Sequence, residues 1–112
     1  GEGVIVNITD WCAERPYRGY LPYGASKAGL AALTTGLAKA LAPEVRVNAV
    51  APGPVMFAAD MPRAQRDVVL KKTPLGREGS PANVAAAVRF LVETADFTTG
   101  ASLTVDGGRA ID

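Results

Sequence analysis

Two short runs rich in β-branched residues limit what this sequence can fold into more than any other feature. Residues 4–8 form a nearly continuous run between Gly3 and Asp10, and residues 45–50 repeat the signature. Runs of this kind are typical of parallel strands that are covered on both faces. We therefore predict two buried strands that belong to one parallel sheet.

A long helix is predicted between the two runs. Residues 22–41 are rich in alanine and leucine, and Pro43 follows at a point where a helix must already have ended. The small residues from Ala25 to Gly36 permit the close approach of a second element. The pattern leaves open whether that element is the sheet or a helix of another subunit.

The second half of the chain predicts one more helix and a third strand. Ser80 is a favoured N-cap residue and Pro81 suits the first helical turn, so a helix is expected over residues 81–93. A turn at Thr99 and Gly100 then leads into a short strand at residues 102–105.

A weak amphipathic pattern covers residues 60–72, inside the long loop that follows the second strand. Long loops of this kind often act as lids over binding sites. The apolar residues of the segment either line such a lid or belong to the ordinary core, and the pattern leaves both open: Met61, Val68 and Leu70.

Strands that alternate with helices predict an α/β layered fold with three parallel strands. The first strand would be an exposed apolar edge if nothing preceded it, so we expect another sheet segment to pair with it. The sequence starts with Gly1 rather than Met and shows no leader. We therefore expect this chain to be part of a longer polypeptide.

Charge and composition exclude several classes of partner. Twelve basic and eleven acidic side chains leave a net charge of +1, so no nucleic-acid partner is expected. The longest uncharged stretch, residues 47–59, contains proline and glycine, so we expect no membrane-spanning helix. Cys12 is the single cysteine and histidine is absent, which predicts neither a disulfide nor a metal site and favours the cytoplasm.

Tyr23 and Lys27 lie one helical turn apart at the start of the long predicted helix, on the same face. A phenol, whose pKa in an unperturbed side chain is about 10, is a poor proton donor at neutral pH. A nearby ammonium favours the phenolate and lowers that pKa toward the working range, which suits general acid catalysis. The pair alone is weak evidence, because this spacing also arises by chance.

The predicted topology brings further groups to the same place. Asp10 follows the first strand, and a loop with Pro52, Gly53 and Val55 follows the second. Ligands of open parallel sheets bind outside the carboxyl ends of the strands. We therefore expect Asp10, Tyr23 and this loop at one edge of the sheet.

Three motifs that occur in this order resemble the carboxyl-terminal half of the short-chain dehydrogenase/reductase family. They are Tyr-Gly-Ala-Ser-Lys at residues 23–27, Val-Asn-Ala-Val-Ala-Pro-Gly at residues 47–53 and Val-Asp-Gly-Gly at residues 105–108. The resemblance implies that residues 1–112 are the C-terminal part of one NAD(P)-binding domain with a doubly wound, Rossmann-like parallel sheet. It also implies that helix 81–93 lies opposite helix 22–41, although two right-handed crossovers would put both on one face.

The resemblance assigns roles to the candidate residues. The family's tyrosine exchanges the substrate proton, which falls on Tyr23, and its lysine lowers the tyrosine pKa and binds the nicotinamide ribose, which falls on Lys27. The loop of Pro52, Gly53 and Val55 would meet the nicotinamide. NADPH is the expected cofactor, with NADH as the alternative, and the expected assembly is a homotetramer paired through helix 22–41.

Asp10 departs from the family pattern, which has a serine at this position to hold a carbonyl oxygen. A carboxylate would repel a developing alkoxide, yet it can hydrogen-bond the N–H groups of an amino-heterocycle and relay a proton to a ring nitrogen. In this respect the sequence is similar to the pteridine reductases, including dihydromonapterin reductases. The simpler interpretation of Asp10 is a solvated residue at a strand end.

Three more residues have two interpretations each, and a fourth departs from the family pattern. Trp11 either stacks on a pterin ring or only packs, and Arg109 is either a surface charge or a group that reaches the substrate of a neighbouring subunit, as the resemblance implies. Cys12 has no basic neighbour in the sequence and is interpreted as a small apolar filler rather than a nucleophile. Phe57 stands where the family has a threonine that contacts the cofactor pyrophosphate. The resemblance therefore does not extend to this contact.

No glycine-rich phosphate loop follows any predicted strand, so the phosphate-binding N-terminal half is absent from these residues. The family's catalytic asparagine is absent too, since Asn7 and Asn48 lie within strands. We predict an NADPH-dependent reductase that acts on a pterin. The alternatives are a ketone or 3-oxoacyl-thioester reductase, and a non-catalytic chain that only pairs with another chain.

Overall fold

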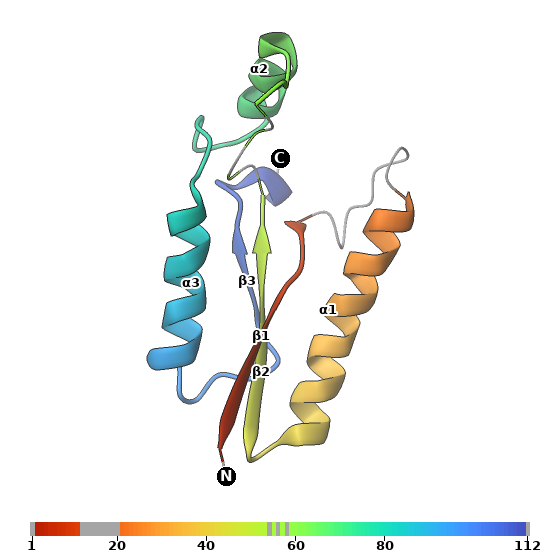
Figure 1. Ribbon diagram of the computed structural model, residues 1–112, viewed down its shortest axis with the longest axis vertical. Helices are drawn as coiled ribbons and strands as arrows, with labels where there is room; N and C mark the ends of the chain where they lie inside the picture. The colour runs from red at the N-terminus through yellow and green to blue at the C-terminus, as the bar shows by residue number, and fades with distance from the viewer. Residues whose placement is uncertain (1, 12–20, 54, 56, 58, 112) are drawn as a thin grey trace.

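The computed structural model describes residues 2–11, 21–53, 55, 57 and 59–111. In chain order, helical connections join the strands of one sheet, and the second connection contains two helices (Figure 1). They are β1 (Gly3–Ile8), α1 (Leu21–Leu41), β2 (Val45–Pro52), α2 (Arg63–Lys71), α3 (Pro81–Glu93), β3 (Ser102–Val105) and the 3-10 turn η3 (Arg109–Ile111).

The sheet has three parallel strands in the order β1-β2-β3, which confirms the predicted fold class. Ile8 of β1 lies opposite Val50, and Val50 lies opposite Leu103 of β3. The central strand is the best buried part of the molecule, with Val47 and Val50 both at 0% exposure. Every β2 residue from 47 to 51 is buried.

The helices α1 and α3 cover opposite faces of the sheet (Figure 1). On the α1 face, the Asn7 side chain donates a hydrogen bond to Thr34 Oγ1 at 2.9 Å. On the α3 face, Val50 packs in one cluster with Ala87 and Leu91. This confirms the placement that the family resemblance implies. Since strands adjacent in the chain are also adjacent in the sheet, one of the two helical connections departs from the right-handed rule.

The bounds of β2 and α2 differ most from the sequence predictions. Strand β2 continues to Pro52, which lies opposite Val105 of β3. The Gly53 amide then donates to the Val105 carbonyl at 2.9 Å, so the ladder between β2 and β3 continues past the proline. Helix α2 begins only at Arg63, because Pro62 has extended backbone angles and occupies the N-cap position.

Polar side chains on β2 hold the segment that links α3 to β3. The Arg46 guanidinium donates to the carbonyls of Leu91 at 3.0 Å and Ala95 at 2.6 Å, so it satisfies groups at the end of α3. The amide of the fully buried Asn48 donates to the Thr98 carbonyl at 2.9 Å and accepts from the amide of residue 101 at 3.0 Å. Asn48 is therefore a structural residue of the strand.

At its other end, α3 begins with the predicted cap. The Ser80 backbone amide donates to the side-chain oxygen of Asn83 at 2.8 Å, as part of a capping box. Pro81 occupies the first turn. In the described part of the chain, no helix is long and apolar enough to cross a membrane.

Truncation of Leu91 tests the core between α3 and the sheet. Leu91 is only 2% exposed, and Leu91→Ala should lower the free energy of unfolding by about 2–5 kcal/mol. Urea titration followed by circular dichroism measures this. Val92→Ala is the matched control, because Val92 is 45% exposed on the same helix and its truncation should change stability by less than about 1 kcal/mol. Equal losses for the two variants would contradict the described core.

Candidate active site

Asp10 and Tyr23 form a hydrogen-bonded pair at the carboxyl edge of the sheet. The Tyr23 phenol donates to Asp10 Oδ2 at 2.9 Å. Asp10 lies just after β1, and Tyr23 lies in the first turn of α1. Tyr23 is accessible to solvent, since 46% of the residue is exposed. Two of the predicted site residues are thus in direct contact, and Tyr23 is accessible to a small molecule.

Lys27 lies beside this pair on the same helix face. Its ammonium donates to the carbonyl of Ile8, the last residue of β1, at 3.2 Å. The Nζ atom is 5.7 Å from the centre of the Tyr23 ring. The phenol of Tyr23 therefore has a carboxylate in contact and a cation one side chain away. Such a group can hold or release a proton as its neighbours change.

The loop after β2 makes a close backbone contact with the end of β3. A Cβ atom on Gly53 would lie 2.5 Å from Cβ of Asp106, so only glycine fits here. The Val55 amide then donates to the Gly53 carbonyl at 2.8 Å. The turn brings Val55 to the wall of a hollow and not into a described contact with Tyr23.

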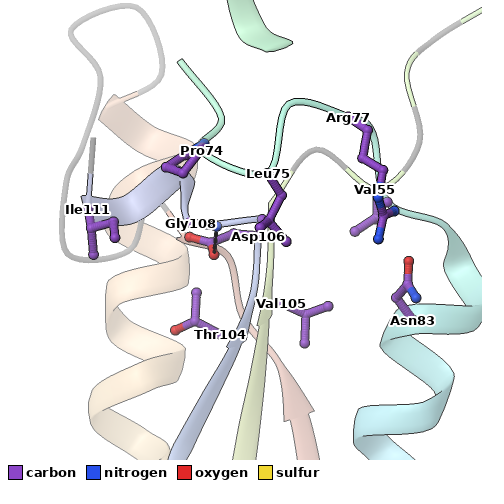
Figure 2. A pocket seen from close by; sticks show the side chains of 12 residues that line it. Val55, Pro74, Leu75, Arg77, Asn83, Thr104, Val105, Asp106, Gly108 and Ile111 are labelled. Atoms are coloured by element: carbon purple, nitrogen blue, oxygen red, sulfur yellow. Dashed lines mark hydrogen bonds between the residues drawn. The ribbon is translucent and has the colours of Figure 1, made fainter. Parts of the chain in front are cut away.

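That hollow, of about 580 Å³, lies at the carboxyl end of β3 (Figure 2). Its wall comes from the end of β3, the segment between α2 and α3, and η3, and includes Val55, Leu75, Arg77, Asn83, Asp106 and Ile111. It does not include Asp10, Tyr23 or Lys27. The sequence showed no signal for this hollow, because its wall is assembled from segments that lie far apart in the chain.

Trp11 and Arg109, two separate candidates in the sequence, lie against each other. The Arg109 guanidinium carbon is 4.7 Å from the centre of the Trp11 ring, which is a cation–π contact. Arg109 belongs to η3 at the far end of the chain, whereas Trp11 directly follows Asp10. The family resemblance implies a reach of Arg109 toward a neighbouring subunit, and here the side chain contacts its own chain.

The remaining candidates lie around α2 or outside the described residues. The Phe57 amide donates to Glu78 Oε2 at 2.6 Å, and the Arg66 guanidinium lies 5.5 Å from the Phe57 ring centre. Helix α2 projects beyond the strand ends and has no buried residue, so the interpretation of Val68 as core is wrong (Figure 1). Cys12 lies outside the described residues. Within the described ranges, no cluster of three or more His, Cys, Asp or Glu residues could hold a metal ion.

A parallel α/β sheet with a tyrosine and a lysine one turn apart at its carboxyl edge is the arrangement that the resemblance to this family of oxidoreductases implies. Comparison with known proteins agrees, because the family described as "Enoyl-(Acyl carrier protein) reductase" matches residues 1–110. The chain belongs to the short-chain dehydrogenase/reductase family.

Individual relatives have different substrates. A putative ketoacyl reductase of the granaticin polyketide synthase from Streptomyces violaceoruber is 43% identical over 96% of this chain and 45% of its own length. The dihydromonapterin reductase of Klebsiella pneumoniae is 37% identical over 96% of this chain and 44% of its own length. A crystal structure of a short-chain dehydrogenase/reductase from Brucella melitensis, titled glucose/ribitol dehydrogenase, superposes with a TM-score of 0.86 at 31% identity; the match covers 95% of this chain and 44% of that one. The chain thus spans about half the length of the relatives that it matches.

Proposed function

We propose that this chain supplies the proton-donating part of a cytoplasmic, NADPH-dependent reductase that reduces a C=N bond of a pterin. The observation that carries the proposal is the 2.9 Å hydrogen bond from the Tyr23 phenol to Asp10 Oδ2. A carboxylate at this point accepts hydrogen bonds from the amino and ring N–H groups of a pterin. The anionic oxygen formed from a ketone would instead be repelled.

The residues at the sheet edge fit the nicotinamide end of such a cofactor. The ammonium of Lys27 has three donors, one of which is used by the Ile8 carbonyl, and the family resemblance assigns a ribose contact to this residue. The backbone at Pro52, Gly53 and Val55 would border the nicotinamide. When bound, the cofactor supplies a hydride to the carbon of the C=N bond.

The chain's own residues would complete the reduction with a proton for the ring nitrogen. Tyr23 holds that proton on its hydroxyl, next to the Asp10 carboxylate. Lys27 stabilises the phenolate that remains after proton transfer, since its positively charged Nζ atom lies 5.7 Å from the centre of the Tyr23 ring. Asp10 orients the heterocycle and passes the proton between solvent and the phenol.

The main alternative is a ketone or 3-oxoacyl-thioester reductase, and the ketoacyl reductase from Streptomyces violaceoruber favours it. A different alternative is a non-catalytic chain that only pairs with another chain, which the β1 edge favours, since that strand pairs only with β2 in the described sheet. Turnover with reduced cofactor separates the catalytic proposals from the last one. Comparison of the turnover of a dihydropterin with that of a ketone separates the pterin reductase from the ketone or 3-oxoacyl-thioester reductase.

Substitutions of Tyr23 and Asp10 test the proposal in a fusion of this chain to the dinucleotide-binding half of the Klebsiella enzyme. Tyr23→Phe should lower kcat for every substrate by about 10²- to 10⁴-fold, because the proton donor is lost. Asp10→Asn should lower kcat/KM for dihydropterin by about tenfold or more and spare ketones. Asp10→Ser should lose pterin reduction and gain weak ketone reduction.

Steady-state kinetics with dihydrobiopterin and a 3-oxoacyl thioester measure these effects. Arg89→Ala is the control, because the Arg89 side chain is 77% exposed on α3, outside the proposed site and pairing helix, and it should leave kcat and KM unchanged. Melting temperatures must agree within a few degrees before rates are compared. Unaltered pterin turnover in a well-folded Asp10→Ser variant would refute the assignment of a pterin substrate.

The 112-residue chain by itself should not bind NADPH or NADH at micromolar concentration. Its sequence has no glycine-rich loop after a strand, and such a loop with the following helix N-terminus supplies the pyrophosphate contacts in dinucleotide folds. Isothermal titration calorimetry measures this directly. A micromolar dissociation constant would contradict the proposed division of the cofactor site between two halves.

We further propose that the active protein is a homotetramer paired through α1. The buried residues of helix α1 are Gly24, Thr34 and Ala38, and its outward face has a stripe of exposed, mostly small residues. A Cβ atom added at Gly29 or Gly36 would meet no atom within 4 Å, so there is room on this face for a second helix.

Gly36→Arg tests this assembly in the active fusion. An arginine in an exposed helix interior is favoured over glycine by up to about 1 kcal/mol, so the variant should fold well and yet lose tetramers in light scattering. Ala64→Arg, at an exposed position of α2, is the control and should keep them. A Gly36→Arg variant that remains tetrameric, or an active fusion that is monomeric, would contradict pairing through α1.

A further inference from the structure

We propose that Asp106 is a positioning residue of the active site, which fixes the turn that holds Arg109 against Trp11. The Trp11–Arg109 stack then forms a wall of the substrate site beside Asp10, within one chain. The substrate part of this inference rests on the proposed function, because a wall beside Asp10 matters only if Asp10 binds the substrate. The positioning part rests on the geometry of the C-terminal turn.

The Asp106 carboxylate organises this turn through backbone amides. Asp106 is only 8% exposed. One of its oxygens accepts the amide of Gly108 at 2.9 Å, and the other accepts the amide of Ala110 at 2.8 Å. The Asp106 carbonyl accepts the amide of Arg109 at 3.1 Å. A single residue thus holds three amides of the segment that contains Arg109, and hydrogen bonds to an ionised carboxylate are the stronger kind.

Packing holds the same turn from two sides. Gly107 and Gly108 have φ angles of +64° and +90°, and a Cβ on Gly108 would lie 2.9 Å from Cγ of Pro74. The Leu75 amide donates to the Gly107 carbonyl at 2.9 Å. Figure 2 shows Pro74 and Leu75 close above Asp106 and Gly108. On the other side, Asp106 meets Gly53 of the loop after β2, so the turn is held between that loop and the segment before α3.

The stack includes the residue that directly follows Asp10 in the chain. Arg109 lies 4.7 Å from the Trp11 ring centre, and Trp11 is the residue after Asp10. A cation over an indole is attracted to the ring face, which favours one ring orientation at a strand end. An indole next to a carboxylate that recognises N–H groups suits a planar amino-heterocycle, because the flat ring can pack on the indole.

Trp11 is the single tryptophan of the chain, so its fluorescence reports on this stack alone. In the 112-residue chain, Arg109→Ala should raise the acrylamide quenching constant of Trp11 about twofold and shift its emission to the red. Asp106→Ala removes both carboxylate acceptors and should have the same effect with Arg109 still present. Asp106→Asn keeps one acceptor and should give an intermediate constant, and Arg109→Lys should restore part of the protection.

Arg89→Ala is the matched control, because it removes an arginine whose side chain is 77% exposed on α3, and it should leave Trp11 unchanged. Far-ultraviolet circular dichroism must show the same secondary structure for all variants. If Asp106→Ala does not fold, Asp106→Asn decides. Unchanged Trp11 quenching in Arg109→Ala would overturn the stack. A changed constant in Arg109→Ala together with unchanged constants in the Asp106 variants would overturn the positioning role.

Kinetics in the fusion enzyme test the substrate part. Asp106→Asn should raise KM for dihydrobiopterin about tenfold and leave kcat within about twofold, because the wall affects binding and not proton transfer. A lower kcat with unchanged KM would overturn the role of the wall. If the unsubstituted fusion reduces ketones but no pterin, the proposed function fails, whereas the Trp11 measurements still decide whether Asp106 positions the stack.

Discussion

The burial of β2 between two helices is the constraint on which the rest of the structure depends. Its neighbours β1 and β3 pair with it on either side, and α1 and α3 cover its two faces. Val47 and Val50 are inaccessible to solvent, and the polar Asn48 is tolerated there because its amide group donates to the Thr98 carbonyl and accepts from the Ala101 amide. The strand ends that carry Asp10, Gly53 and Asp106 thereby reach one edge of the sheet.

The chemistry at that edge follows from a charge placed next to a phenol. A serine hydroxyl in place of Asp10 would be neutral and able to donate a hydrogen bond to a carbonyl oxygen. The Asp10 carboxylate only accepts, and it takes the proton of Tyr23 into a hydrogen bond of 2.9 Å. Lys27, anchored on the Ile8 carbonyl, sets a positive charge near the same phenol. This pairing of a carboxylate with a phenol is the basis for the proposed pterin substrate, which offers N–H groups.

The local patterns predicted most of the fold, whereas the contacts between distant segments could be predicted only in part. Residues 4–8 and the Ser80–Pro81 pair carried enough local signal for a strand and a helix start. The meeting of Asp10 with Tyr23 followed from parallel topology, because strand ends share an edge. No comparable rule predicts the contact of Trp11 with Arg109 or the hydrogen bonds from Arg46 to the end of α3. Each of these contacts depends on where a segment distant in the chain lies in the folded structure.

The backbone amides of β1 fall into two sets, because one edge of the strand pairs with β2 and the other is unpaired in the described sheet. Gly3 donates to the Glu44 carbonyl and Thr9 donates to the Val50 carbonyl, so amides of odd-numbered residues point to β2. Those of Val4, Val6 and Ile8 point to the side where the described sheet has no further strand. In terms of hydrogen exchange, β1 is protected at every second residue. A strand that pairs along this edge would protect the even-numbered amides as well. The hydrogen-exchange pattern of β1 therefore shows whether another strand extends the sheet.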